Sequence, residues 1–247
     1  DDPVDDWGNP LTVRSSALYA ATVIAGGTVI DTDTTWTAAE SPYLITGDVT
    51  VQTSSKLTIT EGVTVLFLAD TDDQTSGDEL YDSELLVDGQ IYAQGTAEAP
   101  VTFTSTASNP EPGQWGGIRI GQRDDYDTED SRFDYVVVQY SGYGIVTSKP
   151  NADLRITNSE FNSQGGYAIT LRGYTYLPSD SHVLVDNNQF RSSGIRTYSA
   201  VDYGRLTISN NVFSTIKTGY GIRASDLWFE MDLVISNNRI SMSQPAQ

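Results

Sequence analysis

A repeated Gly-Ile-Arg triplet is the clearest candidate in this sequence for a site that binds an anion. It occurs at 117–119, 194–196 and 221–223. If the isoleucine of a triplet faces the interior of a β-strand fold, the arginine after it faces the solvent. Arg196 and Arg223 would then lie one above the other, with Arg172 close by. Stacked guanidinium groups repel each other and need an anion between them, either a uronate or sulfate of a polysaccharide or an internal carboxylate such as Asp202 or Asp226.

Tyrosines cluster near the same triplets and add a second feature suited to sugars. The candidate ligand-binding tyrosines are Tyr143, Tyr167, Tyr198 and Tyr220. A phenol ring stacks against the face of a sugar, and its hydroxyl forms hydrogen bonds. With the arginines, these side chains would form a carbohydrate-binding face. The alternative is that several of them cover loops or fill corners of the fold.

Two acidic runs are candidate cation sites. The first holds the residues that we consider for Ca²⁺, which are Asp70, Asp72, Asp73, Asp78 and Glu79, with Asp82 nearby. Calcium accepts several carboxylate oxygens in irregular loops. The run does not follow the EF-hand pattern, because its glycine comes too late, and an ordinary solvated acidic loop is the alternative. A second acidic run spans 124–130.

Groups suited to catalysis are scarce. The chain has one histidine, His182, and no cysteine, which excludes disulfides and thiolate metal sites. His182 directly precedes an apolar strand-like run, where a surface histidine is more common than a general base. No serine and aspartate stand at a spacing that supports a triad. The catalytic residues are therefore unassigned, and the sequence favours a binding protein over an enzyme.

The charge restricts the partners. The net charge is −19, from 33 acidic and 14 basic residues, so nucleic acid and anionic lipid are poor partners. No apolar run approaches the roughly 20 residues of a membrane span. The two ends of the sequence have the composition of linkers. We expect an exported, extracellular or cell-surface protein, either freed of a signal peptide or part of a larger surface protein.

The elements that must position these residues are short β-strands arranged in repeats. Four segments, beginning at Leu154, Val183, Leu206 and Leu233, align without gaps and share one asparagine position. That position is occupied by Asn158, Asn187, Asn210 and Asn237. Asparagine tolerates the left-handed backbone of a sharp bend, and its side chain can bond the equivalent asparagine one repeat away.

A second row of residues runs between these segments at the same period of about 25 residues. Its members are the isoleucines Ile145, Ile169, Ile195 and Ile222. This period is too short for a strand, a crossover helix and a second strand. It fits a coil of three short strands that stacks on its neighbours at about 4.8 Å per coil.

The chain resembles the secreted bacterial right-handed parallel β-helix proteins of the pectate-lyase-like superfamily. The resemblance covers about residues 36 to 240, and its most specific parts are 47–67, 95–105 and 115–118. It implies an all-β fold, a single right-handed parallel β-helix with three short sheets. The superfamily contains lyases, hydrolases, epimerases, adhesins and inert stalks, so the fold alone does not specify an activity. Its lyases hold calcium on clustered acids and use Arg or Lys as the base.

We therefore expect residues 1–35 to form a tether and an irregular N-terminal cap, 36–240 the β-helix, and 241–247 a tail. The expected function is a surface module without catalysis that binds a polysaccharide, a cell-surface glycan or another surface partner. A polysaccharide lyase or hydrolase of the superfamily, with Ca²⁺ as its cofactor, is one alternative. A structural spacer within a larger adhesin is the other.

Overall fold

The computed structural model describes residues 20–72, 74, 77, 79–121, 130–147, 153–172, 182–198, 204–216, 220–225 and 232–242. Within these residues the chain forms short strands in three parallel sheets, which we call sheets I, II and III. A short 3₁₀ turn, η1 (Ala38–Glu40), adds to the strands. No helix of this part of the chain is long and apolar enough to cross a membrane.

The strands follow one another in the order sheet I, sheet II, sheet III. Sheet I contains β1 (Thr22–Ile24), β4 (Tyr43–Ile45), β7 (Thr64–Phe67), β10 (Val101–Ser105), β13 (Val136–Gln139), β16 (Glu160–Asn162), β19 (Gln189–Arg191), β22 (Val212–Ile216) and β25 (Arg239–Met242). Sheet II contains β2 (Thr28–Ile30), β5 (Val49–Val51), β8 (Glu84–Val87), β11 (Gly117–Ile120), β14 (Ile145–Thr147), β17 (Ile169–Arg172), β20 (Ile195–Tyr198) and β23 (Ile222–Ala224). Sheet III contains β3 (Thr34–Trp36), β6 (Lys56–Ile59), β9 (Gln90–Gln94), β12 (Ser131–Asp134), β15 (Leu154–Thr157), β18 (His182–Asp186), β21 (Arg205–Ser209) and β24 (Asp232–Ser236).

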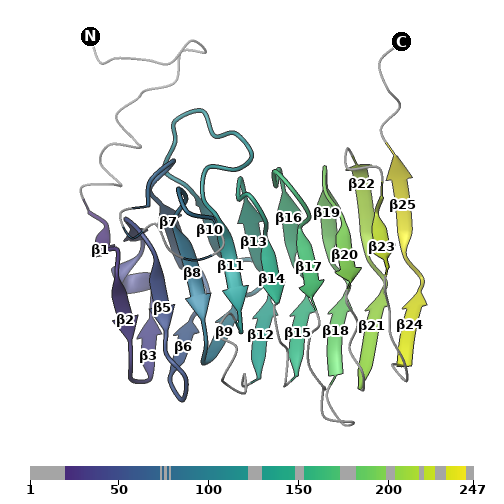
Figure 1. The fold of residues 1–247 in the computed structure, drawn as a ribbon, viewed down its shortest axis with the longest axis horizontal. Helices are drawn as coiled ribbons and strands as arrows, with labels where there is room; N and C mark the ends of the chain where they lie inside the picture. Colours follow the sequence, from purple (N-terminus) through teal and green to yellow (C-terminus); the bar gives the residue numbers. More distant parts are fainter. Residues whose placement is uncertain are drawn as a thin grey trace.

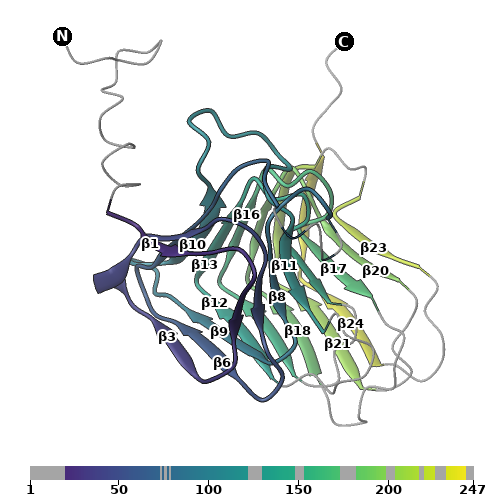
Figure 2. The same cartoon turned by 60° about the vertical axis from the view of Figure 1, so that its left-hand side comes forward.

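The chain winds as a right-handed parallel β-helix, which confirms the predicted fold class. Each coil contributes one strand to each sheet, and successive coils lie side by side along the long axis (Figures 1 and 2). The first coil is built from β1, β2 and β3. Within the described residues the first strand is β1, which starts at Thr22, whereas the sequence pattern places the start of the β-helix at residue 36. At the other end β25 runs to Met242.

The interior consists of columns of apolar side chains, because every second residue of a strand faces inward. The predicted isoleucine row is one of these columns: Ile145, Ile169, Ile195 and Ile222 are partners in successive strands of sheet II. In sheet I, Phe161, Phe190 and Phe213 stack with ring centroids 5.1 and 4.6 Å apart. Each coil thus buries a few large side chains against its two neighbours.

The predicted asparagines occupy the bend between sheets III and I. Asn158, Asn187, Asn210 and Asn237 all have φ between 53° and 56°. They follow strand residues that are direct partners, so they stand in single file. Asn187 donates a hydrogen bond to Oδ1 of Asn158 at 2.7 Å. Left-handed backbone at this bend and asparagine-to-asparagine bonding are both as the repeat predicts.

A second asparagine row, one residue further along, faces the interior and was not predicted. Asn188 and Asn211 are buried. The Oδ1 atom of Asn211 accepts bonds from the backbone N and the Nδ2 of Asn188, at 2.9 and 3.0 Å. Asn238 does the same for Asn211, at 3.0 Å in both bonds. The ladder satisfies the polar backbone of the bend in successive coils.

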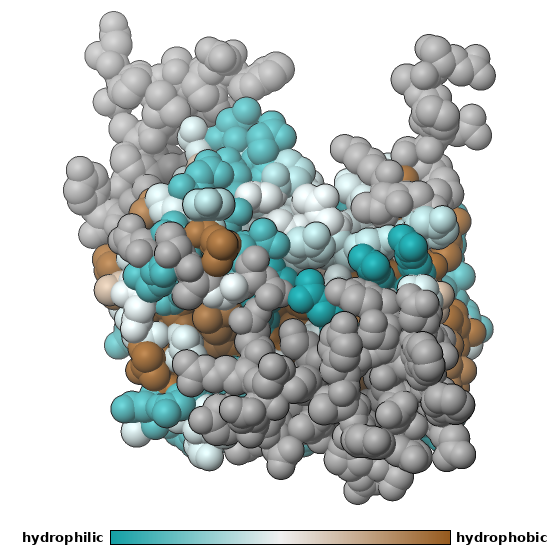
Figure 3. All heavy atoms as spheres, viewed as in Figure 1, coloured by the Kyte–Doolittle hydropathy of each residue, from teal (hydrophilic) through white to brown (hydrophobic). Residues whose placement is uncertain are grey.

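The last described strands of sheets III and I, β24 and β25, expose part of their interior columns. Ile235 and Ile240 are 46% and 47% exposed, whereas their partners Ile208 and Phe213 in the preceding coil are fully buried. Figure 3 shows hydrophobic surface at the right-hand edge, where β24 and β25 lie. Burial of each coil therefore depends on having a neighbour on both sides.

Candidate functional site

The arginines of the Gly-Ile-Arg triplets lie in one outward-facing column of sheet II. Arg119, Val146, Thr170, Arg196 and Arg223 are partners in register on successive strands from β11 to β23. Arg196 and Arg223 are therefore direct neighbours, as the triplet spacing predicts. Alternation along each strand sends these side chains outward, because the isoleucine before each arginine is in the interior column.

Arg172 on β17 occupies the next outward column, and its register partner on β20 is Tyr198. Arg172 is thus placed on the same face as Arg196, again as predicted. The side chain of Tyr198 and the residues Asp202 and Asp226, suggested as internal partners, lie outside the described residues.

Tyrosines from the turns that lead into sheet II lie against these arginines. The guanidinium carbon of Arg119 is 5.4 Å from the ring centroid of Tyr143. The corresponding distances are 5.8 Å for Arg196 and Tyr167, and 5.4 Å for Arg223 and Tyr220. All three are within the range of a cation–π interaction. We call this group, Tyr143, Tyr167, Arg172, Arg196, Tyr220 and Arg223, the Arg/Tyr face.

The arrangement of Tyr143 depends on a glycine of the following coil. A Cβ atom at Gly166 would lie 2.5 Å from Cε1 of the Tyr143 ring. Only a residue without a side chain lets the ring approach the backbone of the next coil this closely. The glycine in the turn of the next coil therefore helps to hold the Tyr143 ring beside the column of arginines.

The two ends of the arginine column differ in exposure. Arg119 is fully buried, whereas Arg223 is exposed and Tyr220 is 53% exposed. Arg196, Tyr167 and Arg172 are half-buried. A dissolved ligand can therefore reach the part of the face between β17 and β23. Arg119, at the other end of the column, has a different role.

Arg119 forms a buried ion pair that sequence reasoning missed. Its Nε bonds the carboxylate of the fully buried Glu84, and its Nη2 lies 3.5 Å from Oε1 of Glu79. Asp48 accepts a 2.8 Å bond from the backbone N of Glu84. One signal was present in the sequence, because Glu84 opens the otherwise apolar strand β8. A buried carboxylate of this kind requires a cationic partner.

The acidic segment before β8 brings three carboxyl groups of the predicted calcium site, those of Asp70, Asp72 and Glu79, near Asp82. Burial raises the pKa of Asp82, and the carboxylates of Asp70, Glu79 and Asp72 raise it further. Asp73 and Asp78 lie outside the described residues. Among the described residues, no group of three or more His, Cys, Asp or Glu side chains has the arrangement of a metal site. Calcium binding by Asp70, Asp72 and Glu79 stays a prediction.

His182 lies on β18 of sheet III, away from the sheet that carries the arginines. Its Nε2 is 2.9 Å from Oγ1 of Thr207. Burial lowers the pKa of the imidazole, and the nearby Arg205 lowers it further. The structure therefore does not bring His182 together with the Arg/Tyr face.

Two family models match the chain. A model described as a pectate-lyase-like beta helix domain matches residues 27–144. A model described as a right-handed beta helix region matches residues 103–245, more than half of the chain. No curated protein and no solved structure gives a significant match.

Proposed function

Because the chain belongs to the right-handed beta helix family, we propose that it is an extracellular or cell-surface module that binds an acidic polysaccharide without turning it over. The binding site is the Arg/Tyr face of sheet II. The family supplies the scaffold, and this face supplies the chemistry, since members of one fold differ in function through the residues that they display.

One observation carries the proposal. Arg196 and Arg223 are direct neighbours on parallel strands, and each lies over a tyrosine ring. A planar guanidinium recognises a carboxylate or sulfate through paired hydrogen bonds. The rings of Tyr167 and Tyr220 offer apolar surface for the sugar. The arginines and the tyrosine rings lie side by side, so together they offer charge and apolar surface to a chain of uronate or sulfated sugar units.

Direct mutation tests the site. Polygalacturonate and sulfated glycans are titrated against the wild type and against Arg196→Ala/Arg223→Ala, with calorimetry as the readout. We expect at least a tenfold loss of affinity in the double variant, and weaker wild-type binding as salt screens the charges. Arg132→Ala is the matched control, because it removes an arginine from the outer face of sheet III. Equal binding by the wild type and the double variant would remove the site assignment.

A polysaccharide lyase is the second candidate, favoured by the match to the pectate-lyase-like model. The arginines of sheet II would then supply the base, and the acidic segment would supply calcium ligands. Incubation with polygalacturonate, read as absorbance of the unsaturated product, tests this candidate. Product that disappears on chelation of calcium supports the lyase. If the protein neither binds the polysaccharide nor forms product, the result would support a structural spacer instead.

A further inference from the structure

The row of left-handed residues at the bend between sheets III and I contains one member that does not suit the backbone. Tyr135 stands in this row one coil before Asn158, since Asp134 and Thr157 are partners in register. Its φ is 49°, close to the values of the asparagines. Asparagine and glycine adopt this conformation readily, whereas a bulky residue does so only under strain. Strained positions of this kind cluster at functional sites.

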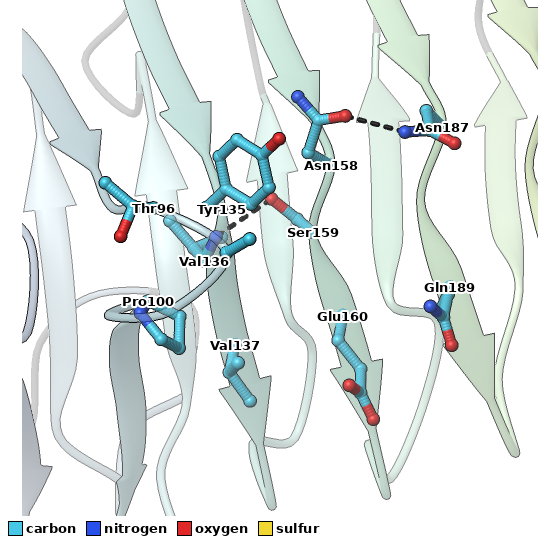
Figure 4. Close-up of a pocket in the computed structure, with 11 residues that line it drawn as sticks. Thr96, Pro100, Tyr135, Val136, Val137, Asn158, Ser159, Glu160, Asn187 and Gln189 are labelled. Atoms are coloured by element: carbon cyan, nitrogen blue, oxygen red, sulfur yellow. Dashed lines mark hydrogen bonds between the residues drawn. The ribbon is translucent and has the colours of Figure 1, made fainter.

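A pocket of about 150 Å³ lies directly beside this tyrosine. The loop 96–100 forms one wall, through Thr96 and Pro100, and the row of Asn158 and Asn187 continues from the tyrosine on the other side (Figure 4). The outward side chains Val137, Glu160 and Gln189 of sheet I complete the lining, and they are partners on successive strands. The pocket thus opens on a different corner of the molecule from the Arg/Tyr face.

The lining combines an aromatic ring with fixed polar groups. Tyr135 is half-buried and lines the pocket, and Pro100 adds apolar surface to the lining. Glu160 is held in place, because its Oε1 accepts bonds from Nε of Arg191 at 2.9 Å and from Nδ2 of Asn162 at 2.8 Å. Asn187 and Gln189 are exposed and present amide groups.

We propose that this pocket binds one neutral sugar unit of a glycan. The tyrosine ring and the proline pack against the apolar face of the sugar, and the carboxylate and amides bond its hydroxyl groups. Among the described residues of the lining, Glu160 alone carries a charge, and its carboxylate disfavours uronates and sulfates. The asparagine row spaces amide groups one coil apart, which allows neighbouring sugar units to be bonded in turn.

The sequence of the row supplies a sharp test. Tyr135→Asn restores the residue that the following four coils use at this bend, so the variant should fold and melt at the same or a higher temperature. Wild type is screened against neutral hexasaccharides of glucose, mannose, galactose and xylose, with polygalacturonate as the acidic comparison, by saturation-transfer NMR and calorimetry. We expect binding of at least one neutral hexasaccharide, and at least tenfold weaker binding by Tyr135→Asn.

Two control variants separate this site from the other features. Tyr135→Phe keeps the ring and should retain most of the affinity for the neutral sugar. Arg196→Ala/Arg223→Ala should bind the neutral sugar as the wild type does, because those arginines are on sheet II. The proposal is wrong if no neutral hexasaccharide binds the wild type, or if Tyr135→Asn binds it equally well. A clearly lower melting temperature for Tyr135→Asn would also overturn the proposal, because it would show that the tyrosine stabilises the fold by packing.

Discussion

The same triplet in the sequence gives two different roles to its arginine. Arg119 and Arg223 both follow Gly-Ile, and both face outward from sheet II. Arg119 is buried because the acidic segment before β8 lies over it, which Glu79 shows by its contact with the guanidinium. Arg223 is exposed at the surface. The repeat sets the position of each arginine within its coil. Whether that arginine is accessible depends on the inserted segment that lies beside it.

Removal of one partner of the buried ion pair should strongly destabilise the fold. Arg119→Ala leaves Glu84 buried without its cation, and we expect a loss of about 3–5 kcal/mol in the free energy of unfolding. Urea denaturation followed by circular dichroism measures the loss. The double variant Glu84→Leu/Arg119→Met removes both charges and should recover most of it. A single variant as stable as the wild type would show that the pair is not buried in solution.

Asp82 should weaken the fold at neutral pH. Its pKa in the folded protein is raised above the ordinary 3.8, so between the two values the folded state keeps a proton that the unfolded state has released. The free energy of unfolding therefore falls as the pH rises through this interval, and it stays lowered above it. Asp82→Asn should raise the melting temperature at pH 7 and leave it nearly unchanged near pH 3.5.

The control for Asp82 is Glu98→Gln, which removes the same charge from the exposed loop 96–100. It should shift the melting temperature little at either pH. A gain from Asp82→Asn that is equal at both pH values would contradict the raised pKa, because it would reflect packing of the amide and not the ionisation of the carboxyl.

At the scale of the elements, the bends at Asn187, Asn210 and Asn237 each carry two functions in adjacent residues. The residue in the left-handed conformation turns the chain, and the residue after it enters the interior to bond backbone groups of neighbouring coils. Asn211 illustrates the second function: its Nδ2 donates to the carbonyl O of Val185 at 3.0 Å, and its Oδ1 accepts from the backbone N of Asn188. The strands can be short because these bonds fix their ends.

Asn211→Ala should therefore be much more harmful than a change at the neighbouring turn position. It leaves buried backbone groups of Val185 and Asn188 without their bonds, at a cost of about 1–3 kcal/mol for each group. Asn210→Gly is the control, because glycine adopts the same positive φ and costs only the exposed bond to Asp186. Thermal melts and hydrogen exchange at these amides measure the difference. Similar losses in both variants would contradict the separate functions.

At the scale of the whole molecule, stability is the sum of contacts between neighbouring coils. An interior position contributes fully only when a coil lies on each side of it. Ile208 and Ile235 are partners on β21 and β24, yet the first is fully buried and the second is 46% exposed. The two positions have the same residue type and the same place in the coil.

These two isoleucines give a matched pair of variants. Ile208→Ala should lower the free energy of unfolding by about 2–5 kcal/mol, as deletions in a packed core do. Ile235→Ala should cost less than half of that in this chain, because much of its side chain is already in contact with water. Urea denaturation measures both values. Equal losses would show that the last coil is covered in solution.

The sequence by itself determined the coil architecture and which residues of each strand face inward or outward. Two rows of residues with one shared period, the asparagines from Asn158 and the isoleucines from Ile145, fix the register of all later coils, because each coil contacts only its neighbours. Strict alternation along the strands then makes Arg196 and Arg223 outward neighbours. These features are local and periodic, so a single sequence reveals them.

Only the tertiary structure decided which of these residues are accessible and what they contact. The contact of Arg119 with Glu79 and the pocket beside Tyr135 depend on non-periodic segments, such as 70–82 and 96–100. The path of such a segment across a face is set by side-chain packing between residues far apart in the chain. No repeat records that path, which is why the scaffold was predictable and the details of its sites were not.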